Sequence, residues 1–290
     1  MGSSSTAEPA RFRPILKWAG GKARLVPSIL PLLPASIDTY YEPFVGGAAV
    51  FFALASERRF RRAVLSDLNS ELVDVYRGVK KDVEAVVRLL RDYRRRHDED
   101  TYYRTRAIDP QSLELVERAA RLIYLNKTGY NGLYRVNRSG QFNVPFGRYE
   151  SPSICDEERL RGAAAALRAR GVRLAVGDFA QVTAQAEPGD AVYFDPPYEP
   201  RSTTANFTSY QSQAFGREAH ERLAQTLEEL TRRQVRTVLS NSDTRFTQKL
   251  YDRKRFGVLK VQVTRPINSK SSARGRVGEL LVDNSRLLAQ

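Results

Sequence analysis

Residues 190–200, DAVYFDPPYEP, join a strand-like pattern to groups that can hold an amino nitrogen. The apolar run 192–194 predicts a strand, which ends at Asp195, two prolines and Tyr198. The carboxylate and a proline carbonyl can accept hydrogens from an exocyclic amino group, while the tyrosine stacks on its ring. Two such acceptors would free the nitrogen lone pair and stabilise the positive charge that develops during attack. A strand that merely stops at two prolines would leave the flanking Asp and Tyr unexplained.

A second motif could approach a ligand with its backbone. EPFVGG (42–47) places an acidic residue at a predicted strand end, before glycines that open a helix with free N–H groups. Asp67 ends the next predicted strand, 21 residues after Gly46, where an acidic residue takes the ribose hydroxyls of a bound nucleoside. The residues alone leave open the alternative of a tight turn and a helix cap.

The segment KWAGGKAR (17–24) looks like a phosphate loop but lacks its essential residues. Lys22 is followed by Ala23 instead of Ser or Thr, and Leu16 stands where the first glycine should be. The chain's one Trp lies beside two glycines and between two lysines, which favours a place in the floor of a site.

The composition limits the function classes. The 290 residues carry 47 Lys+Arg against 33 Asp+Glu, a net charge of +14, which is the electrostatic footprint of a nucleic-acid binder. One cysteine (Cys155) excludes an intrachain disulfide and fits a reducing cytoplasm. With two histidines in all, a zinc cluster of His and Cys is not expected. Residues 1–13 lack an apolar signal core and predict a disordered leader, and no long uncharged apolar run predicts a membrane helix.

Alternating strands and helices predict an α/β fold with a mainly parallel sheet. The expected strands are 39–44, 62–69, 173–178, 190–195, 236–243 and 279–284, with helices at 46–57 and 217–233. The stretch 70–155 differs, because it holds two helices (82–100, 114–128) and an Arg-rich aromatic block (129–149) with hairpin turn chemistry. We therefore expect a catalytic domain from 14–69 and 156–290, a smaller inserted domain at 70–155, and a basic loop at 265–278.

Five motifs in order resemble the Dam-type DNA adenine-N6 methyltransferases, in the group whose DPPY motif comes last. They are KWAGGK, EPFVGGAAVFF, SDLN, LNKTGYNGLYRVNRSGQFNVPFGRY and FDPPY, and the resemblance spans about residues 14–284. It implies a Rossmann-like methyltransferase domain with an inserted helical and β-hairpin domain for DNA recognition. It also implies S-adenosyl-L-methionine as donor, S-adenosyl-L-homocysteine as product, no metal, and methylation of a flipped-out adenine in duplex DNA.

The resemblance assigns roles residue by residue. The catalytic motif is Asp195, Pro196, Pro197 and Tyr198, in which Asp195 and the Pro196 carbonyl take the N6 hydrogens. Cofactor contacts match Trp18, Lys22, Asp67 and Asp195, with Glu42, Phe44 and Gly46 lining the pocket and Asp178 and Phe179 beside the cofactor's adenine. Ala48 stands where many relatives have glycine, and its methyl group would narrow the pocket slightly.

The 129–149 block and two flanking segments supply the implied DNA contacts. Arg135 matches the reader of the guanine in the second half of a GATC site, and Lys17 matches the reader of the first guanine. The remaining contacts are Tyr130 as a wedge, Asn131 and Asn137 near the DNA, Leu133 and Pro145 near the thymine, and Arg274 and Arg276 on phosphates. From the residues alone, the block could also be a polar hairpin on a basic surface.

Other substrates and classes stay open at this point. A methyltransferase could act on cytosine N4, RNA adenine or protein glutamine, although the first and last usually carry Ser-Pro-Pro-Tyr and Asn-Pro-Pro-Tyr. A catalytically inactive DNA-binding protein that retains only the methyltransferase fold would be expected to have lost Asp195, Tyr198 or the cofactor glycines, and all are present. We expect a monomer in a bacterial-type cytoplasm, associated with the nucleoid when bound to DNA, with a cognate restriction endonuclease as a possible genomic partner.

Overall fold

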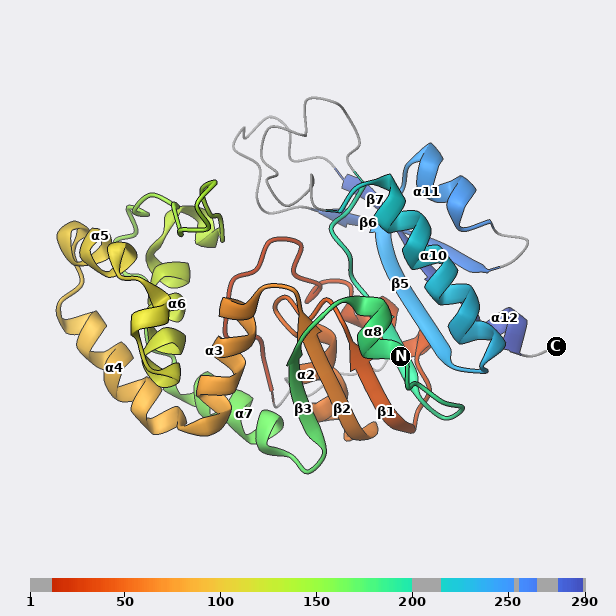
Figure 1. The fold of residues 1–290 in the computed structure, drawn as a ribbon, viewed down its shortest axis with the longest axis horizontal. Helices are drawn as coiled ribbons and strands as arrows, with labels where there is room; N and C mark the ends of the chain where they lie inside the picture. Colours follow the sequence, from red (N-terminus) through yellow and green to blue (C-terminus); the bar gives the residue numbers. More distant parts are fainter. Residues whose placement is uncertain (1–11, 200–214, 253–255, 265–275, 289–290) are drawn as a thin grey trace, which may run out of the picture.

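The computed structural model describes residues 12–199, 215–252, 256–264 and 276–288, which build a seven-stranded sheet flanked by helices (Figure 1). The strands are β1 (Ile37–Glu42), β2 (Phe60–Asp67), β3 (Val172–Val176), β4 (Ala191–Phe194), β5 (Arg236–Ser242), β6 (Gly257–Thr264) and β7 (Arg276–Asp283). Their order across the sheet is β3-β2-β1-β4-β5-β7-β6. The first five of these are parallel, and β7 runs antiparallel to both β5 and β6. The predicted α/β fold with a mainly parallel sheet is confirmed.

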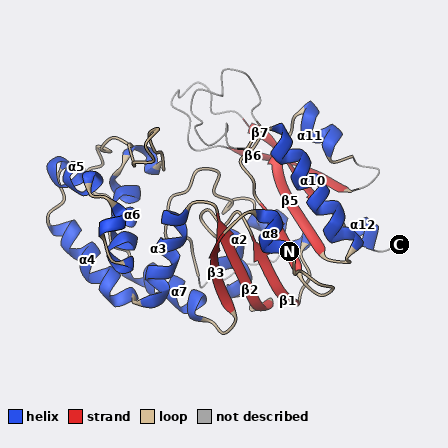
Figure 2. Cartoon of the chain, in the orientation of Figure 1, coloured by secondary structure: helices blue, strands red, loops and turns tan. Residues whose placement is uncertain are grey.

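Helices cover both faces of this sheet and extend beyond one of its edges (Figures 1 and 2). They are α1 (Val26–Ile29), α2 (Ala49–Ser56), α3 (Ser70–Lys81), α4 (Val83–Arg95), α5 (Glu99–Ala107), α6 (Leu115–Thr128), α7 (Glu157–Arg168), α8 (Phe179–Thr183), α10 (Arg217–Arg232), α11 (Arg245–Leu250) and α12 (Ser285–Leu288). Short 3-10 turns add η1 (Leu30–Leu32), η2 (Pro110–Ser112) and η3 (Tyr130–Gly132).

Alternation along the strands divides the core into two layers. Tyr193 of β4 packs into the cluster that contains α2, whereas Val192 and Phe194 pack into the cluster that contains α8 and α10. Tyr40 and Tyr41 of β1 separate in the same way, because successive side chains of a strand point to opposite faces. Both sheet faces are thus apolar, which explains why these strands read as continuous hydrophobic runs.

Helix α3 joins the sheet to the helical region beside β3. The Lys80 ammonium donates to the Val172 carbonyl of β3 at 2.6 Å, and Glu71 accepts from Arg121 of α6 at 3.3 Å. One apolar cluster runs from β2 through α3 to α4 and α6. The division of the chain into domains at residue 70 stays a prediction, and the two expected parts share this core.

The antiparallel edge of the sheet differs from the sequence expectation. Strand β6 was not predicted, and β7 begins at Arg276 instead of 279, so the end of the expected 265–278 loop is strand. The physical reason is strand pairing: Thr264 lies opposite Arg276, and the ladder continues to Gly257 opposite Asp283. Residues 265–275 and 1–11 of the expected loop and leader lie outside the described part of the chain. Within that part, no helix combines the length and apolar character needed to cross a bilayer.

The close approach of α3 and α6 yields a stability prediction. A Cβ at Gly78 would lie 2.5 Å from the Ala119 Cβ and 3.0 Å from the Leu115 carbonyl oxygen. We expect Gly78→Ala to lower the free energy of unfolding by about 1–3 kcal/mol through overpacking, despite a helix-propensity gain of about 1 kcal/mol. Denaturant titration measures this change. Gly216→Ala is the control, because its Cβ would meet nothing within 4 Å; equal stability of the Gly78 variant and the wild type would contradict the packing argument.

Candidate active site

The polar residues singled out in the sequence gather at one edge of the sheet. Glu42 ends β1, Asp67 ends β2 and Asp195 directly follows β4. These three strands are neighbours in the order β2-β1-β4 and run parallel, so their carboxyl ends meet. The chain leaves β1 toward β2 on one side and returns in β4 on the other, which is the switch point where open α/β sheets bind ligands.

Asp195 is held by residues from two other segments. The Lys22 ammonium lies 2.6 Å from its Oδ1 and also donates to the Gly20 carbonyl at 2.5 Å. The Ser240 hydroxyl of β5 donates to the same carboxylate oxygen at 2.9 Å. Burial raises the pKa of Asp195, and the Lys22 charge acts in the opposite direction. The neighbouring cation therefore favours the ionised carboxylate, which is the form that accepts hydrogens.

Tyr198 lies on the other side of the same lysine. The Lys22 ammonium is 4.6 Å from the centroid of the Tyr198 ring, so a nitrogen cation sits between a carboxylate and an aromatic face. The Tyr198 hydroxyl donates to Glu279 Oε2 at 2.8 Å. Pro196 is buried and Pro197 is exposed. The Asp195 carboxylate and the Tyr198 ring of this turn therefore approach the same ammonium group.

The glycine turn after β1 is packed against Trp18. Gly46 has φ +44°, and a Cβ there would lie 3.0 Å from Trp18 Cδ1. The Gly46 amide donates to Asp67 Oδ2 at 3.3 Å, and the Tyr76 hydroxyl donates to the Gly46 carbonyl at 2.6 Å. Gly46 is therefore required both by its left-handed backbone and by the close packing of Trp18 against this turn. Ala48 also adopts a left-handed conformation, with φ 56°.

An aromatic cluster extends the site toward β3. Phe44 stacks on Phe179 at 5.5 Å between ring centroids. Asp178 caps α8 through the Ala180 amide and accepts two hydrogen bonds from Arg222 of α10, at 3.1 and 2.6 Å. The Arg222 guanidinium also lies 4.5 Å from the Phe179 ring centroid. A flat cation thus covers the place where the resemblance puts the cofactor's adenine.

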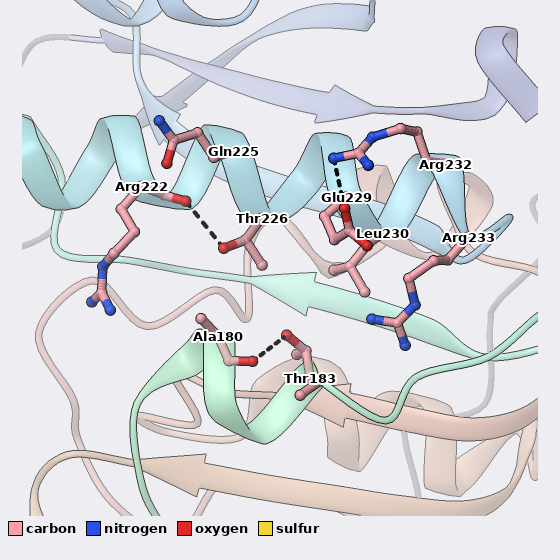
Figure 3. A pocket seen from close by; sticks show the side chains of 10 residues that line it. Ala180, Thr183, Arg222, Gln225, Thr226, Glu229, Leu230, Arg232 and Arg233 are labelled. Carbon is pink, nitrogen blue, oxygen red and sulfur yellow. Dashed lines mark hydrogen bonds and ion pairs between the residues drawn. The ribbon is translucent and has the colours of Figure 1, made fainter.

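A cavity of about 410 Å³ lies between α8 and α10 (Figure 3). Its lining includes Ala180 and Arg222, which also belong to the surroundings of Asp178, together with Thr183, Thr226 and Arg233. The lining does not include any residue of the catalytic turn (195–198).

The recognition block is tied to the same site by neighbouring residues. The Asn126 side chain accepts from the Lys17 amide at 2.9 Å and donates to the Lys17 and Gly132 carbonyls at 2.7 and 2.9 Å. The Trp18 ring packs on Tyr134 at 5.4 Å between centroids. Lys17 is exposed and its ammonium lies 4.9 Å from the centroid of the Tyr149 ring. Lys17 therefore belongs to the surface of the block, and Trp18 to the pocket behind it.

Within the block, the expected DNA contacts lie on one exposed loop and hairpin. Arg135 is exposed, and Asn143 orients its guanidinium through bonds of 2.7 Å to the side chain and 3.0 Å to the backbone. Tyr130 is 47% exposed and next to Asn131, which adopts φ 55°. Asn137 differs, because its amide oxygen accepts from the Ser139 and Gln141 amides and holds the hairpin turn.

The other expected contacts have less defined surroundings. Leu133 packs partly on the main apolar cluster, and the Pro145 carbonyl accepts from the Tyr130 amide at 2.9 Å. Arg274 lies outside the described residues. Arg276 begins β7, but its side chain is not described. Among the described residues, no group of three or more His, Cys, Asp or Glu side chains could hold a metal ion.

Several residues that shape the site were not predicted from the sequence. They are Tyr76, Asn126, Arg222, Ser240 and Glu279. A signal existed for two of them, since Ser240 lies in a polar run (240–243) that ends an apolar strand, and Glu279 opens the apolar run of the last strand. The other three act through tertiary contacts that the local pattern does not specify.

Glu42 generates a pH prediction. It is 2% exposed and accepts from the Tyr40 hydroxyl at 2.9 Å and the Phe51 amide at 3.0 Å, and burial raises its pKa to about 8. The folded chain therefore keeps a proton that the unfolded chain loses above about pH 4.5, so the wild type loses stability as the pH rises toward 8. Glu42→Gln removes this titration and should gain stability relative to the wild type, by at most about 1.4 kcal/mol per pH unit.

Denaturant titrations at several pH values between 5 and 8 measure this difference. Exposed Glu221 offers a matched control, since Glu221→Gln should follow the wild type at every pH. A Glu42→Gln advantage that stays constant across the range would show that the carboxyl group is ionised in the folded state.

Comparison with known proteins places this geometry in a family. Residues 18–267 match the family described as D12 class N6 adenine-specific DNA methyltransferase. A Type II methyltransferase of Lactococcus lactis subsp. cremoris is 40% identical over 94% of this chain and 95% of its own length. A Type II methyltransferase of Methanocaldococcus jannaschii is also 40% identical, over 94% and 99%. The DNA adenine methylase of Escherichia coli K12 is 38% identical over 93% and 94%.

Among solved structures, precorrin-6y C5,15-methyltransferase from Geobacter metallireducens matches with a TM-score of 0.37 and 10% identity, over 93% of this chain and 97% of that chain, which is too distant to support an argument. The family match and the relatives cover nearly the whole chain, including the strand-end carboxylates, the DPPY turn and the hairpin block. The chain therefore belongs to the D12 class of N6 adenine-specific DNA methyltransferases.

Proposed function

We propose that this enzyme transfers a methyl group from S-adenosyl-L-methionine to N6 of an adenine flipped out of duplex DNA, at GATC sites. The observation that carries the chemistry is the position of the Lys22 ammonium between the Asp195 carboxylate and the Tyr198 ring. It supports the proposal, because here a nitrogen with hydrogens to donate lies between an acceptor and an aromatic face. Adenine presents the same combination, with its amino group for Asp195 and its ring for Tyr198.

The residues around the turn have separate tasks in this reaction. Asp195 and the Pro196 carbonyl accept the two hydrogens of the target nitrogen, so that its lone pair is free to attack and the developing positive charge is stabilised. Tyr198 fixes the plane of the base by stacking. S-adenosyl-L-methionine would supply the electrophilic methyl group and become S-adenosyl-L-homocysteine as its bond to that group breaks, and the target nitrogen would give up one of its two protons to solvent. Trp18, Gly46 and Asp67 would hold it at the ends of β1 and β2.

The target base requires the space that Lys22 occupies in this structure. Stacked aromatic rings lie about 3.5–4 Å apart, closer than the ammonium is to the Tyr198 ring, so base and ammonium cannot share that face. Lys22 must therefore turn away when adenine enters. The carboxylate of the cofactor's methionine part is a suitable new partner, because it would replace the Asp195 charge.

DNA recognition is proposed for the exposed face of the 129–149 block. Arg135 presents its guanidinium with an orientation fixed by Asn143, and Lys17 lies on the same unit through Asn126. A pre-oriented arginine suits bidentate contact with guanine N7 and O6. Tyr130, with its exposed ring, would fill the gap left by the flipped base. The Type II names of two relatives support a cognate restriction endonuclease as a partner in the cell.

The test of the function is methyl transfer from labelled S-adenosyl-L-methionine to two matched duplexes, one with a single GATC and one with GTAC. We expect label at adenine N6 of GATC alone. Label on both duplexes would preserve the chemistry and overturn the assignment of GATC as the site. Label at cytosine N4, or transfer to RNA or protein alone, would overturn the proposed substrate.

The preference for GATC should depend on Arg135 more than on Arg138, which lies in the same hairpin. We expect Arg135→Ala to reduce the preference for GATC over GATT about 10- to 100-fold, the discrimination carried by one bidentate contact. Competition assays that compare kcat/KM for the two duplexes measure this ratio. Arg138→Ala is the matched control, because Arg138 is equally exposed on the same hairpin. Equal losses on both duplexes with Arg135→Ala would indicate phosphate binding instead of base reading.

The Lys22 charge should set the pH range of the reaction. Lys22 lowers the pKa of Asp195 against the effect of burial, and Asp195 must be ionised to accept hydrogens. Lys22→Met should therefore raise this pKa in the enzyme before adenine enters, and move the acidic limb of the kcat/KM–pH profile for DNA to higher pH at saturating cofactor. Lys81→Met, at an exposed position, should keep the wild-type profile. An unmoved limb in the Lys22 variant would mean that Asp195 does not control it.

A further inference from the structure

Glu279 is a buried carboxylate that the proposed reaction has not yet used. It lies near the start of β7 and is 5% exposed. Because β7 is antiparallel, its early residues reach the edge where the parallel strands end, and Glu279 lies opposite Ser242 of β5. Its carboxylate accepts from the Tyr198 hydroxyl at 2.8 Å.

The next residue on the same face of β7 is apolar. Leu281 lies two residues after Glu279, so it shares the same face of the strand, and it is fully buried in the main cluster. A carboxylate at such a position is costly to bury unless it receives hydrogen bonds. Burial raises the pKa of the Tyr198 phenol well above its usual value, with the Asp195 charge as the next cause. The phenol therefore keeps its proton and acts as the donor to Glu279.

The neighbouring strand β5 fixes the rest of the catalytic turn. Ser240 donates to Asp195, and the Ser242 hydroxyl donates to the Glu199 carbonyl at 2.7 Å. The Glu199 amide donates to Asn241 Oδ1 at 3.3 Å. These bonds hold the backbone and the carboxylate, but a tyrosine ring can still rotate about its χ angles. The hydrogen bond to Glu279, at 2.8 Å, ties the hydroxyl at the far end of the ring to β7.

We propose that Glu279 is the positioning residue for Tyr198, holding the ring in the plane on which the target base stacks. This inference rests on the proposed function for its substrate, but the orientation of the ring can be measured without any substrate. Glu279 acts through Tyr198 and does not itself touch the base. Its loss should therefore affect turnover and leave cofactor binding unchanged.

The first experiment measures the ring. 3-Fluorotyrosine placed at position 198 gives a ¹⁹F resonance whose shift and width report the orientation and mobility of that ring. We expect Glu279→Ala to change both the chemical shift and the linewidth of this resonance. In Glu279→Gln, which keeps an acceptor oxygen, both should remain close to their wild-type values. An unchanged resonance in Glu279→Ala would overturn the proposal, whatever the enzyme does with DNA.

The second experiment measures turnover with the same variants. We expect Glu279→Ala to lower kcat about tenfold, as for loss of one hydrogen bond to a charged group, with unchanged KM for S-adenosyl-L-methionine. In a Tyr198→Phe background, which lacks the phenol, Glu279→Ala should cause no further loss. A full further loss in that background, or unchanged kcat despite a changed ¹⁹F resonance, would also overturn the proposal.

Two controls separate the possible failures. Asp283→Asn changes a carboxylate of similar burial at the far end of β7, and should leave both the resonance and kcat unchanged. Thermal unfolding of each variant shows whether the fold is intact. If the wild type transfers no methyl group to DNA while the resonance still depends on Glu279, the proposed function fails and the positioning of Tyr198 stands.

Discussion

The site depends on keeping the Asp195 carboxylate ionised in a place where burial opposes its charge. An unpaired buried carboxylate would take up a proton and lose its use as an acceptor. Lys22 and Ser240, from the N-terminal segment and from β5, act against this by lowering the pKa that burial raises. The bond between Lys22 and Asp195 joins chain segments more than 170 residues apart, so the geometry of the catalytic turn requires the whole sheet to be assembled. An ion pair of this kind is weak evidence for stability, but it fixes where the charge lies.

The sequence was sufficient to place the strand-end residues because parallel strands share one carboxyl edge. Each of Glu42, Asp67 and Asp195 ends or follows its own apolar run, and the sheet order brings the three together without further information. The antiparallel edge could not be read in this way. The register that sets Glu279 opposite Ser242 depends on how the chain returns from β6, and no local pattern specifies it. Likewise, Arg222 reaches Asp178 only because α10 packs beside α8.

Three glycines are required by close approach, and only Gly46 was singled out from the sequence. Gly46 leaves room for Trp18 and has a left-handed backbone. Gly132 leaves room for the Lys17 side chain, which a Cβ would approach to 2.7 Å. Gly78 permits the close packing of α3 and α6. The sequence alone does not distinguish a glycine that a ligand approaches from one that the protein's own side chains approach.

Two adjacent residues connect the proposed cofactor and DNA sites. Lys17 is bound through Asn126 to the recognition block, and Trp18 packs on Gly46 on one side and Tyr134 on the other. Under the proposed function, a ligand that presses on the Trp18 ring would act on the residue next to Lys17, the proposed DNA contact. Lys22 would provide a second link, since it would leave the Tyr198 face when the cofactor's carboxylate receives its charge. Under the proposed function, both links favour the same order, in which the cofactor binds before the target base enters the catalytic turn.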